Sequence, residues 1–305
     1  MFKPIDNWLD KITMYRLLLY YLAGLLAVAF VLSLTGALQY SPFAIVVSTA
    51  VLLAACWSVN KIFGYFFDVP INRESSLITA LILALIITPK LGLYDITFLL
   101  AAAGLAMASK YVLTRSNINI FNPAAIAVAL TALGPRQSAN WWVGTAALLP
   151  FVLIGGLLLA RKIRRVPMIA TFVVATFLAT AVYTLLGHGA ILTSLKQAAL
   201  SSPVFFLGFV MLTEPLTSPS TKAKRSWYGA LVGILLPPQV HIASLYSSPE
   251  LSLIIGNAFS FFIDQKKKLF PVLKQKIRIA ASSVDFVFSA NSQLAYQPGQ
   301  YMEWT

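Results

Sequence analysis

The sequence places an acidic residue, Glu214, where a short apolar run ends. Residues 201–213 are mostly apolar, and the polar stretch from Glu214 continues as far as Thr221. If the apolar run lies in a bilayer, a carboxylate at its end is costly and is a functional candidate by default. The alternative is a solvated loop, because basic residues follow at 222–225. We expect a ligand site that includes Thr213, Glu214, Pro215, Thr217 and Ser218.

An asparagine precedes a proline at the start of a second short run. Asn122 can cap the free N–H groups of a helix, and Pro123 suits the first helical turn. The alternative is that these N–H groups, at membrane depth, meet an anionic or carbonyl-rich ligand. Near a third run, Arg73 and Ser75 are further site candidates, although Arg73 also fits an ordinary interfacial charge.

Composition indicates the class to which these elements belong. Of the 305 residues, 58% are hydrophobic and only 11% are charged, whereas a soluble domain has about 25% charged residues. Runs such as 17–34 and 143–160 approach the ~20 residues that cross a bilayer. The first run has no small-residue cleavage site after it and is predicted to be a spanning helix. The net charge of +13 fits charged membrane flanks better than nucleic-acid binding.

Apolar patterning predicts about ten segments. Those near 75–88, 122–134 and 201–213 are too short to span upright, so we expect broken helices whose freed backbone groups are satisfied by protein or by a cavity. The expected segments are 16–36, 41–60, 75–88, 96–113, 122–134, 141–160, 166–186, 201–213, 226–240 and 249–263.

The distribution of basic residues predicts the orientation. With the N-terminus inside, all Lys and Arg except Lys90, Arg136 and Lys196 fall on cytoplasmic pieces. This bias favours a multi-pass protein of a bacterial cytoplasmic membrane with both termini cytoplasmic. We expect Trp141 and Trp142 at the outer membrane interface.

The two halves of the sequence match at a constant offset. Pro89 and Pro215 lie 126 residues apart, as do Pro123 and Pro249. Five segments in each half imply two inverted repeats, at 16–134 and 141–263, and such repeats place a binding site between the halves near the midplane. Chance matching among sixteen prolines is the alternative. The predicted fold is therefore an all-α polytopic membrane domain over 1–264.

Four ordered motifs resemble one family. These are residues 73–89, the Phe-Asn-Pro-Ala-Ala run at 121–125, the Met-Leu-Thr-Glu-Pro-Leu-Thr-Ser-Pro run at 211–219, and residues 256–264. The third is similar to a Thr-Asp-Pro-Val-Thr-Ser-Pro run of that family. The family is the membrane subunit shared by the sodium-pumping NADH:quinone reductase (NqrB) and the Rnf electron-transport complex (RnfD).

The resemblance implies flavin-based electron transfer coupled to Na⁺ or H⁺ movement, and a fold like that of urea transporters. It also implies other electron-transfer subunits or flavoproteins as partners. The Ser-Gly-Ala-Thr run on which family members carry FMN does not occur here. We therefore expect FMN or riboflavin to bind non-covalently. No catalytic residue is assigned, and one cysteine with two isolated histidines gives no metal site.

The residues after 264 differ in composition. Period-two alternation at 276–280 and 284–288 predicts strands, so we expect a short β-rich cytoplasmic piece at 265–305. The run around Tyr296, Pro298, Gly299, Gln300 and Tyr301 resembles the start of a ferredoxin–NADP reductase-type domain, which implies FAD and NAD(P)H. The alternative is a basic, partly ordered tail.

Three functions remain open at this point. The first is flavin-dependent electron transfer as the membrane part of an NAD(P)H-linked oxidoreductase. The second is a channel or solute transporter without redox activity, because the inverted-repeat fold alone does not separate them. The third is a structural subunit that docks partners, which the polar residues at the broken helices disfavour.

Overall fold

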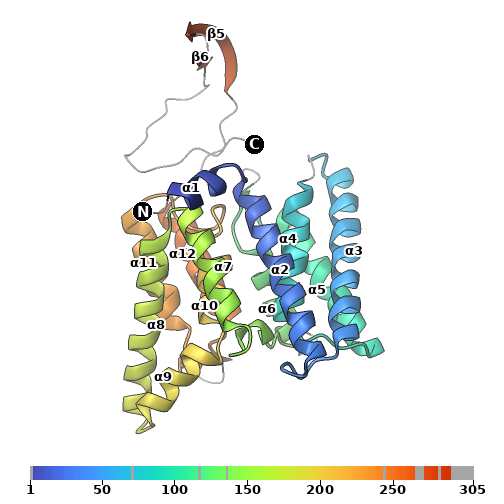
Figure 1. Ribbon diagram of the computed structural model, residues 1–305, viewed down its shortest axis with the longest axis vertical. Coiled ribbons are helices and arrows are strands. Elements are labelled where there is room, and N and C mark those ends of the chain that lie inside the picture. The colour runs from blue at the N-terminus through green and yellow to red at the C-terminus, as the bar shows by residue number, and fades with distance from the viewer. Residues whose placement is uncertain are drawn as a thin grey trace.

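The computed structural model describes residues 3–69, 72–115, 118–134, 137–242, 245–264, 271–280 and 283–289. Most of these residues are helical. Figure 1 shows the helices side by side along one direction, with the C-terminal strands standing clear of them. The predicted helical membrane class is confirmed in this coarse form.

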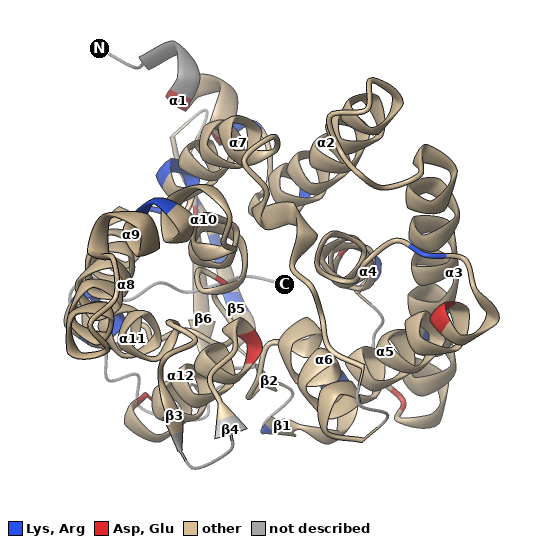
Figure 2. Cartoon of the chain, turned by 90° about the horizontal axis from the view of Figure 1, so that it is seen from below, with Lys and Arg blue, Asp and Glu red and all other residues tan. Residues whose placement is uncertain are grey.

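The first half of the chain forms one group of helices. After the short surface helix α1 (Lys3–Asp10), the group contains α2 (Met14–Leu34), α3 (Pro42–Phe66), α4 (Arg73–Ile86), α5 (Leu93–Val112) and α6 (Pro123–Leu133). Within it, α3 packs on α4 and α5, and α2 packs on α4. Figure 2 shows these helices together on one side of the molecule.

The second half forms the group on the other side in Figure 2. It contains α7 (Leu149–Lys162), α8 (Val166–Leu186), α9 (Ile191–Leu200), α10 (Val204–Phe206), the π-helical segment η2 (Leu207–Met211), α11 (Lys222–Leu235) and α12 (Pro249–Ile263). A short 3₁₀ turn, η1 (Trp142–Gly144), precedes it. The two groups meet where α2 contacts α7 and where α6 contacts α12.

Three two-stranded antiparallel hairpins complete the described elements. Strands β1 (Thr114–Arg115) and β2 (Ile118–Asn119) pair between α5 and α6, and β3 (His241–Ile242) and β4 (Leu245–Tyr246) pair between α11 and α12. Strands β5 (Val272–Ala280) and β6 (Ser283–Ser289) form the third hairpin, with two shifts in register. This hairpin confirms the strands predicted from alternation.

Four described helices are long and apolar enough to cross a membrane: α2, α3, α5 and α8. A fifth candidate is the pair formed by α9 and the segment Val204–Met211, which is bent by 53°. The remaining apolar helices are shorter. Several of them begin with a capping side chain, as Asn72 does for α4 and Ser248 for α12.

Some expectations from the sequence are wrong. Residues 141–160 are not one helix, because Trp141 has a left-handed backbone (φ 51°) and α7 begins only at Leu149. Trp141 and Trp142 are buried within the protein, and their place at the outer membrane interface stays a prediction. Their indole N–H groups find acceptors on other elements, which a hydropathy pattern does not reveal. Helices α1 and α9 were not expected, since α1 is polar and amphipathic and α9 mixes polar with apolar residues.

The contact between α8 and α11 depends on glycines. A Cβ at Gly233 would lie 2.4 Å from the carbonyl oxygen of Phe172 and 2.9 Å from the Cβ of Ala175. A Cβ at Gly229 would lie 2.5 Å from the carbonyl oxygen of Met168. These helices therefore approach as closely as backbones can, which is how helices associate where no hydrophobic driving force exists.

We predict that Gly233→Ala destabilises the protein. Overpacking of a tight contact costs about 1–3 kcal/mol, so the apparent melting temperature of the detergent-purified protein should fall. Gly24→Ala is the matched control, because a Cβ at Gly24 meets nothing within 4 Å. An equal response of the two variants would contradict the packing argument.

Candidate functional site

A cavity lies between the two groups of helices. It holds about 570 Å³ of empty space, a figure that includes space open to the surroundings. Its walls come from the beginnings of α2, α4 and α6 and from the ends of α7 and η2. Apolar side chains dominate, among them Leu18, Ile78, Ile82 and Val210.

One hydrogen bond joins the two halves at the polar part of this cavity. Asn122 Nδ2 donates to Glu214 Oε2 at 2.8 Å. The amide oxygen of Asn122 accepts from the N–H groups of Ala124 and Ala125, both at 3.1 Å. Asn122 therefore caps α6 and binds the acid at the same time. The cap and the acid are consequently parts of one site.

The same asparagine is held from a third element. Its backbone N–H donates to Asn257 Oδ1 at 2.9 Å, and Asn257 Nδ2 donates to the hydroxyl of Tyr228 at 2.9 Å. Asn122, Asn257 and Tyr228 are all buried. Because α6, α11 and α12 each contribute one partner, the backbone entering α6 has little freedom to move.

The loop that carries Glu214 is also fixed. Thr217 Oγ1 lies 3.4 Å from Glu214 Oε2, and Ser218 Oγ donates to the carbonyl oxygen of Glu214 at 2.6 Å. The buried guanidinium of Arg165, at the start of α8, donates to Ser218 Oγ. The carboxylate is therefore positioned by its own loop and by α6.

A lysine from α5 approaches the other wall. Lys110 Nζ donates to the carbonyl oxygen and to the hydroxyl of Ser75, both at 2.9 Å. Ser75 lines the cavity, so this serine holds the Lys110 ammonium against the cavity wall. The site thus combines an acid, a base, an amide and a hydroxyl beside an apolar wall.

The structure brings most of the expected residues together. The cavity is lined by Ser75, Asn122, Pro123, Thr213, Glu214 and Pro215. Thr217 and Ser218 lie buried behind Glu214, whereas Arg73 is exposed and does not line the cavity. The expected residues Tyr296, Pro298, Gly299, Gln300 and Tyr301 lie outside the described residues.

Sequence reasoning missed four residues of this network. Lys110 was taken only as a cytoplasmic charge, and Arg165 only as part of a basic run. Asn257 stood in a motif of the family resemblance without a role, and Tyr228 gave no signal. A polar residue on an otherwise apolar helix is the signal that could have found Asn257.

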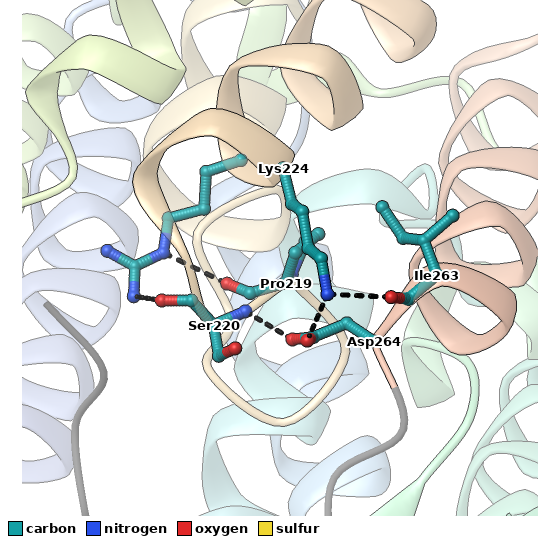
Figure 3. A network of polar contacts seen from close by, with 6 residues as sticks. Pro219, Ser220, Lys224, Ile263 and Asp264 are labelled. Atoms are coloured by element: carbon teal, nitrogen blue, oxygen red, sulfur yellow. Dashed lines mark hydrogen bonds and ion pairs between the residues drawn. The ribbon is translucent and has the colours of Figure 1, made fainter. Parts of the chain in front are cut away.

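A second polar network holds the same loop at its far end (Figure 3). Asp264 accepts from the N–H of Ser220 at 2.5 Å and from Lys224 Nζ at 2.9 Å, and Lys224 also donates to the carbonyl oxygen of Ile263 at 2.7 Å. Arg225 donates to the carbonyl oxygens of Pro219 and Ser220. The end of α12 is thereby tied to the Glu214 loop.

These features define a helical membrane protein with a cavity between short helices. Residues 140–270 match the model of the NQR2, RnfD, RnfE family. The matched residues include two of the motifs that resemble the NqrB/RnfD family, those at 211–219 and 256–264. No curated protein matches the chain.

The Asp264 network gives a pH-dependent prediction. Burial opposes ionisation of Asp264, but the hydrogen bonds from Ser220 and Lys224 outweigh it and lower its pKa below the ordinary 3.8. A lowered pKa in the folded state contributes stability above 3.8 that is lost as the pH falls through the folded value. Asp264→Asn should therefore lower the melting temperature at pH 6, and the difference from wild type should vanish in strong acid. A constant difference at all pH values would contradict this assignment.

Proposed function

We propose that the cavity binds a flavin non-covalently and that the chain carries electrons in the membrane. The family match supports a role in a membrane electron-transport or ion-translocating complex. Other subunits of such a complex are the partners this role requires. Coupling to Na⁺ or H⁺ movement is part of the same proposal.

The observation that carries the proposal is the composition of the cavity. Its walls are mostly apolar, and its polar groups gather where Asn122 meets Glu214. A flavin ring has an apolar edge and an opposite edge rich in carbonyl and N–H groups. The carboxylate can accept from an N–H, while the Ser75 hydroxyl, which accepts from Lys110, can donate its proton to a carbonyl. The residues present therefore fit the ring.

The same geometry favours an uncharged group over a phosphate. The first N–H groups of α6 are the donors that an anion would use. Two of them, those of Ala124 and Ala125, are already bound by the Asn122 side chain. The nearby Glu214 carboxylate also repels an anion. We infer that the ring of riboflavin or FMN, rather than a phosphate, occupies this position.

A bound flavin would supply one- and two-electron redox chemistry, and the protein supplies binding, orientation and electrostatics. Leu18, Ile82 and Val210 exclude water from the ring. Glu214 is held by Asn122, so it presents its carboxylate in one orientation. Lys110 places a positive charge near the same wall through Ser75, which favours negative charge that develops on a reduced ligand.

We also propose that the chain has ten membrane segments in two inverted repeats. Equivalent helices would be α2 and α7, α3 and α8, α4 and the α10–η2 segment, α5 and α11, and α6 and α12. The hairpins support this pairing, because β1–β2 and β3–β4 share one register and lie 127 residues apart. The halves touch through α2–α7 and α6–α12, which are equivalent pairs.

In this arrangement the cavity end of the molecule faces the cytoplasm of a bacterium. The basic residues near that end support it, by the positive-inside rule. There Arg161 bonds to both carboxylate oxygens of Asp6, at 2.7 and 2.8 Å, and ties α1 to α7. Both termini would then be cytoplasmic and the surrounding lipid that of the inner membrane.

We further propose that the β5–β6 hairpin belongs to a reductase-type module with FAD and NAD(P)H. A lone two-stranded hairpin is marginally stable in water. Apolar residues of this one, such as Ile279 and Phe286, are exposed. A larger β domain would stabilise the hairpin and cover these apolar side chains. The flavin of that domain would deliver electrons to the membrane cavity.

The first test is the absorption spectrum of the purified full-length protein. We expect flavin bands in the visible blue, and release of riboflavin or FMN on denaturation because the proposed binding is non-covalent. A preparation that is folded but colourless, and that does not quench added riboflavin or FMN fluorescence, would overturn the flavin proposal.

The second test changes Glu214→Gln. Glutamine keeps an acceptor for Asn122 but removes the charge, so the fold should persist while riboflavin affinity falls about tenfold, as expected for loss of a charge-assisted hydrogen bond. Glu74→Gln is the control, since Glu74 pairs with Arg16 outside the cavity. Equal affinity in the two variants would remove Glu214 from the site.

A further inference from the structure

The end of the molecule opposite the cavity is closed by residues 140–142. Helix α4 ends inside the bundle, at Ile86, and its last carbonyl groups have no partner within the helix. Residues 140–142 of the second half supply donors to them. The backbone N–H groups of Asn140 and Trp141 donate to the carbonyl oxygen of Ile86 at 3.0 and 2.8 Å.

A tryptophan side chain completes this cap. Trp142 Nε1 lies 2.9 Å from the carbonyl oxygen of Ala84 and 3.0 Å from that of Ile87. The ring is 2% exposed and packs edge-on against Tyr40, with centroids 5.3 Å apart. The end of α4 is therefore sealed by a bulky side chain that also satisfies its backbone.

The neighbouring tryptophan is bonded to a buried acid. Trp141 Nε1 donates to Glu250 Oε2 at 2.9 Å, and Glu250 is 4% exposed. Glu250 lies in the first turn of α12, where the helix dipole favours a negative charge. Trp141 holds a left-handed backbone conformation that is uncommon for an aromatic residue. Through this pair the cap of α4 is joined to α12.

Of the two helices held in this way, α4 lines the cavity and α12 binds a residue that lines it. Helix α4 contributes Ser75, Ile78, Thr79 and Ile82 to the cavity wall. Helix α12 contributes Asn257, which binds the Asn122 backbone. A displacement of either helix at the closed end would therefore move groups that form the cavity.

We propose that Trp141, Trp142 and Glu250 form a positioning clamp that closes this end of the molecule and holds α4 and α12 in the arrangement that creates the cavity. At the offset of 126 residues, Asn140 and Trp141 correspond to Met14 and Tyr15, which line the cavity. The equivalent positions thus border the cavity at one end of the molecule and close the other end. This correspondence rests on the proposed repeat, whereas the clamp rests on its contacts alone.

The test uses a cysteine beneath the clamp. In a Cys56→Ala background, Ile87→Cys places a thiol at a position that is 2% exposed. The full-length protein is placed in nanodiscs, where both faces meet water, and the rate of labelling by a charged maleimide is measured. We expect slow labelling with the clamp intact and at least about tenfold faster labelling in Trp142→Ala, since local opening becomes easier.

Conservative variants separate the hydrogen bonds from the volume of the rings. Trp141→Phe and Glu250→Leu should each speed labelling, and the double variant should be no faster than either one, because they break the same bond. Glu250→Gln keeps an acceptor and should label close to the parent rate. Trp227→Ala is the control, because that ring is 71% exposed.

A second readout follows the cavity itself. The labelling rate of Ile82→Cys on α4 should differ between the parent and Trp142→Phe. Phenylalanine keeps an aromatic ring but loses the donor to the carbonyl oxygens of Ala84 and Ile87. Unchanged rates at both cysteines in all clamp variants that melt cooperatively would overturn the clamp. Neither readout involves flavin, so faster labelling in a protein without flavin would retain the clamp and reject only the proposed function.

Discussion

Short helices that end inside an apolar bundle leave backbone groups without partners, and this constraint governs the structure. Such groups are costly in a medium without water. Some of the partners come from the same half, as Asn122 does for α6, and others come from beyond it. Trp142 and the Asn140 backbone serve the end of α4, and the Asn257 side chain serves the residue that caps α6. Hydrogen bonds to helix ends therefore hold the two halves together in addition to apolar packing.

The same constraint explains why polar residues gather between the halves. A short helix brings polar groups into the interior, and a capping side chain can have capacity left for a further contact. Asn122 uses its oxygen to cap α6 and its amide nitrogen to bind Glu214. A carboxylate that costs energy in an apolar interior becomes tolerable because Asn122 donates a hydrogen bond to it. The cavity is the space these fixed groups leave open.

Much of the architecture could be predicted from the sequence, because bilayer thickness and helix rise restrict the length of apolar runs. The predicted run 166–186 coincides with α8, and 249–263 coincides with α12. The prediction of one helix over 141–160 was wrong because the interactions that break this run, those of Trp141 and Trp142, are long-range. Surface helices such as α1 were not predicted because their burial depends on contacts with other helices. Leu9 of α1, for example, packs on Leu17 and Leu159.

The site was predictable only in part, for a related reason. Asn122 and Glu214 can be recognised in the sequence because a proline follows each of them, and proline marks a helix boundary. Lys110 and Tyr228 lie within helices, where nothing local indicates which way a side chain points. Their roles depend on which helices pack together, and a single sequence does not specify that.

The asymmetry between the two ends of the molecule follows from side-chain size. At the cavity end the start of α2 presents Met14 and Tyr15, and space remains beside Asn122. At the opposite end two indoles fill the interface and bond to backbone and acid. Under the proposed repeat, one backbone plan is therefore closed on one side and open on the other without any change in topology. If the halves are equivalent by descent, the sequence differences at these few positions decide from which side a ligand enters.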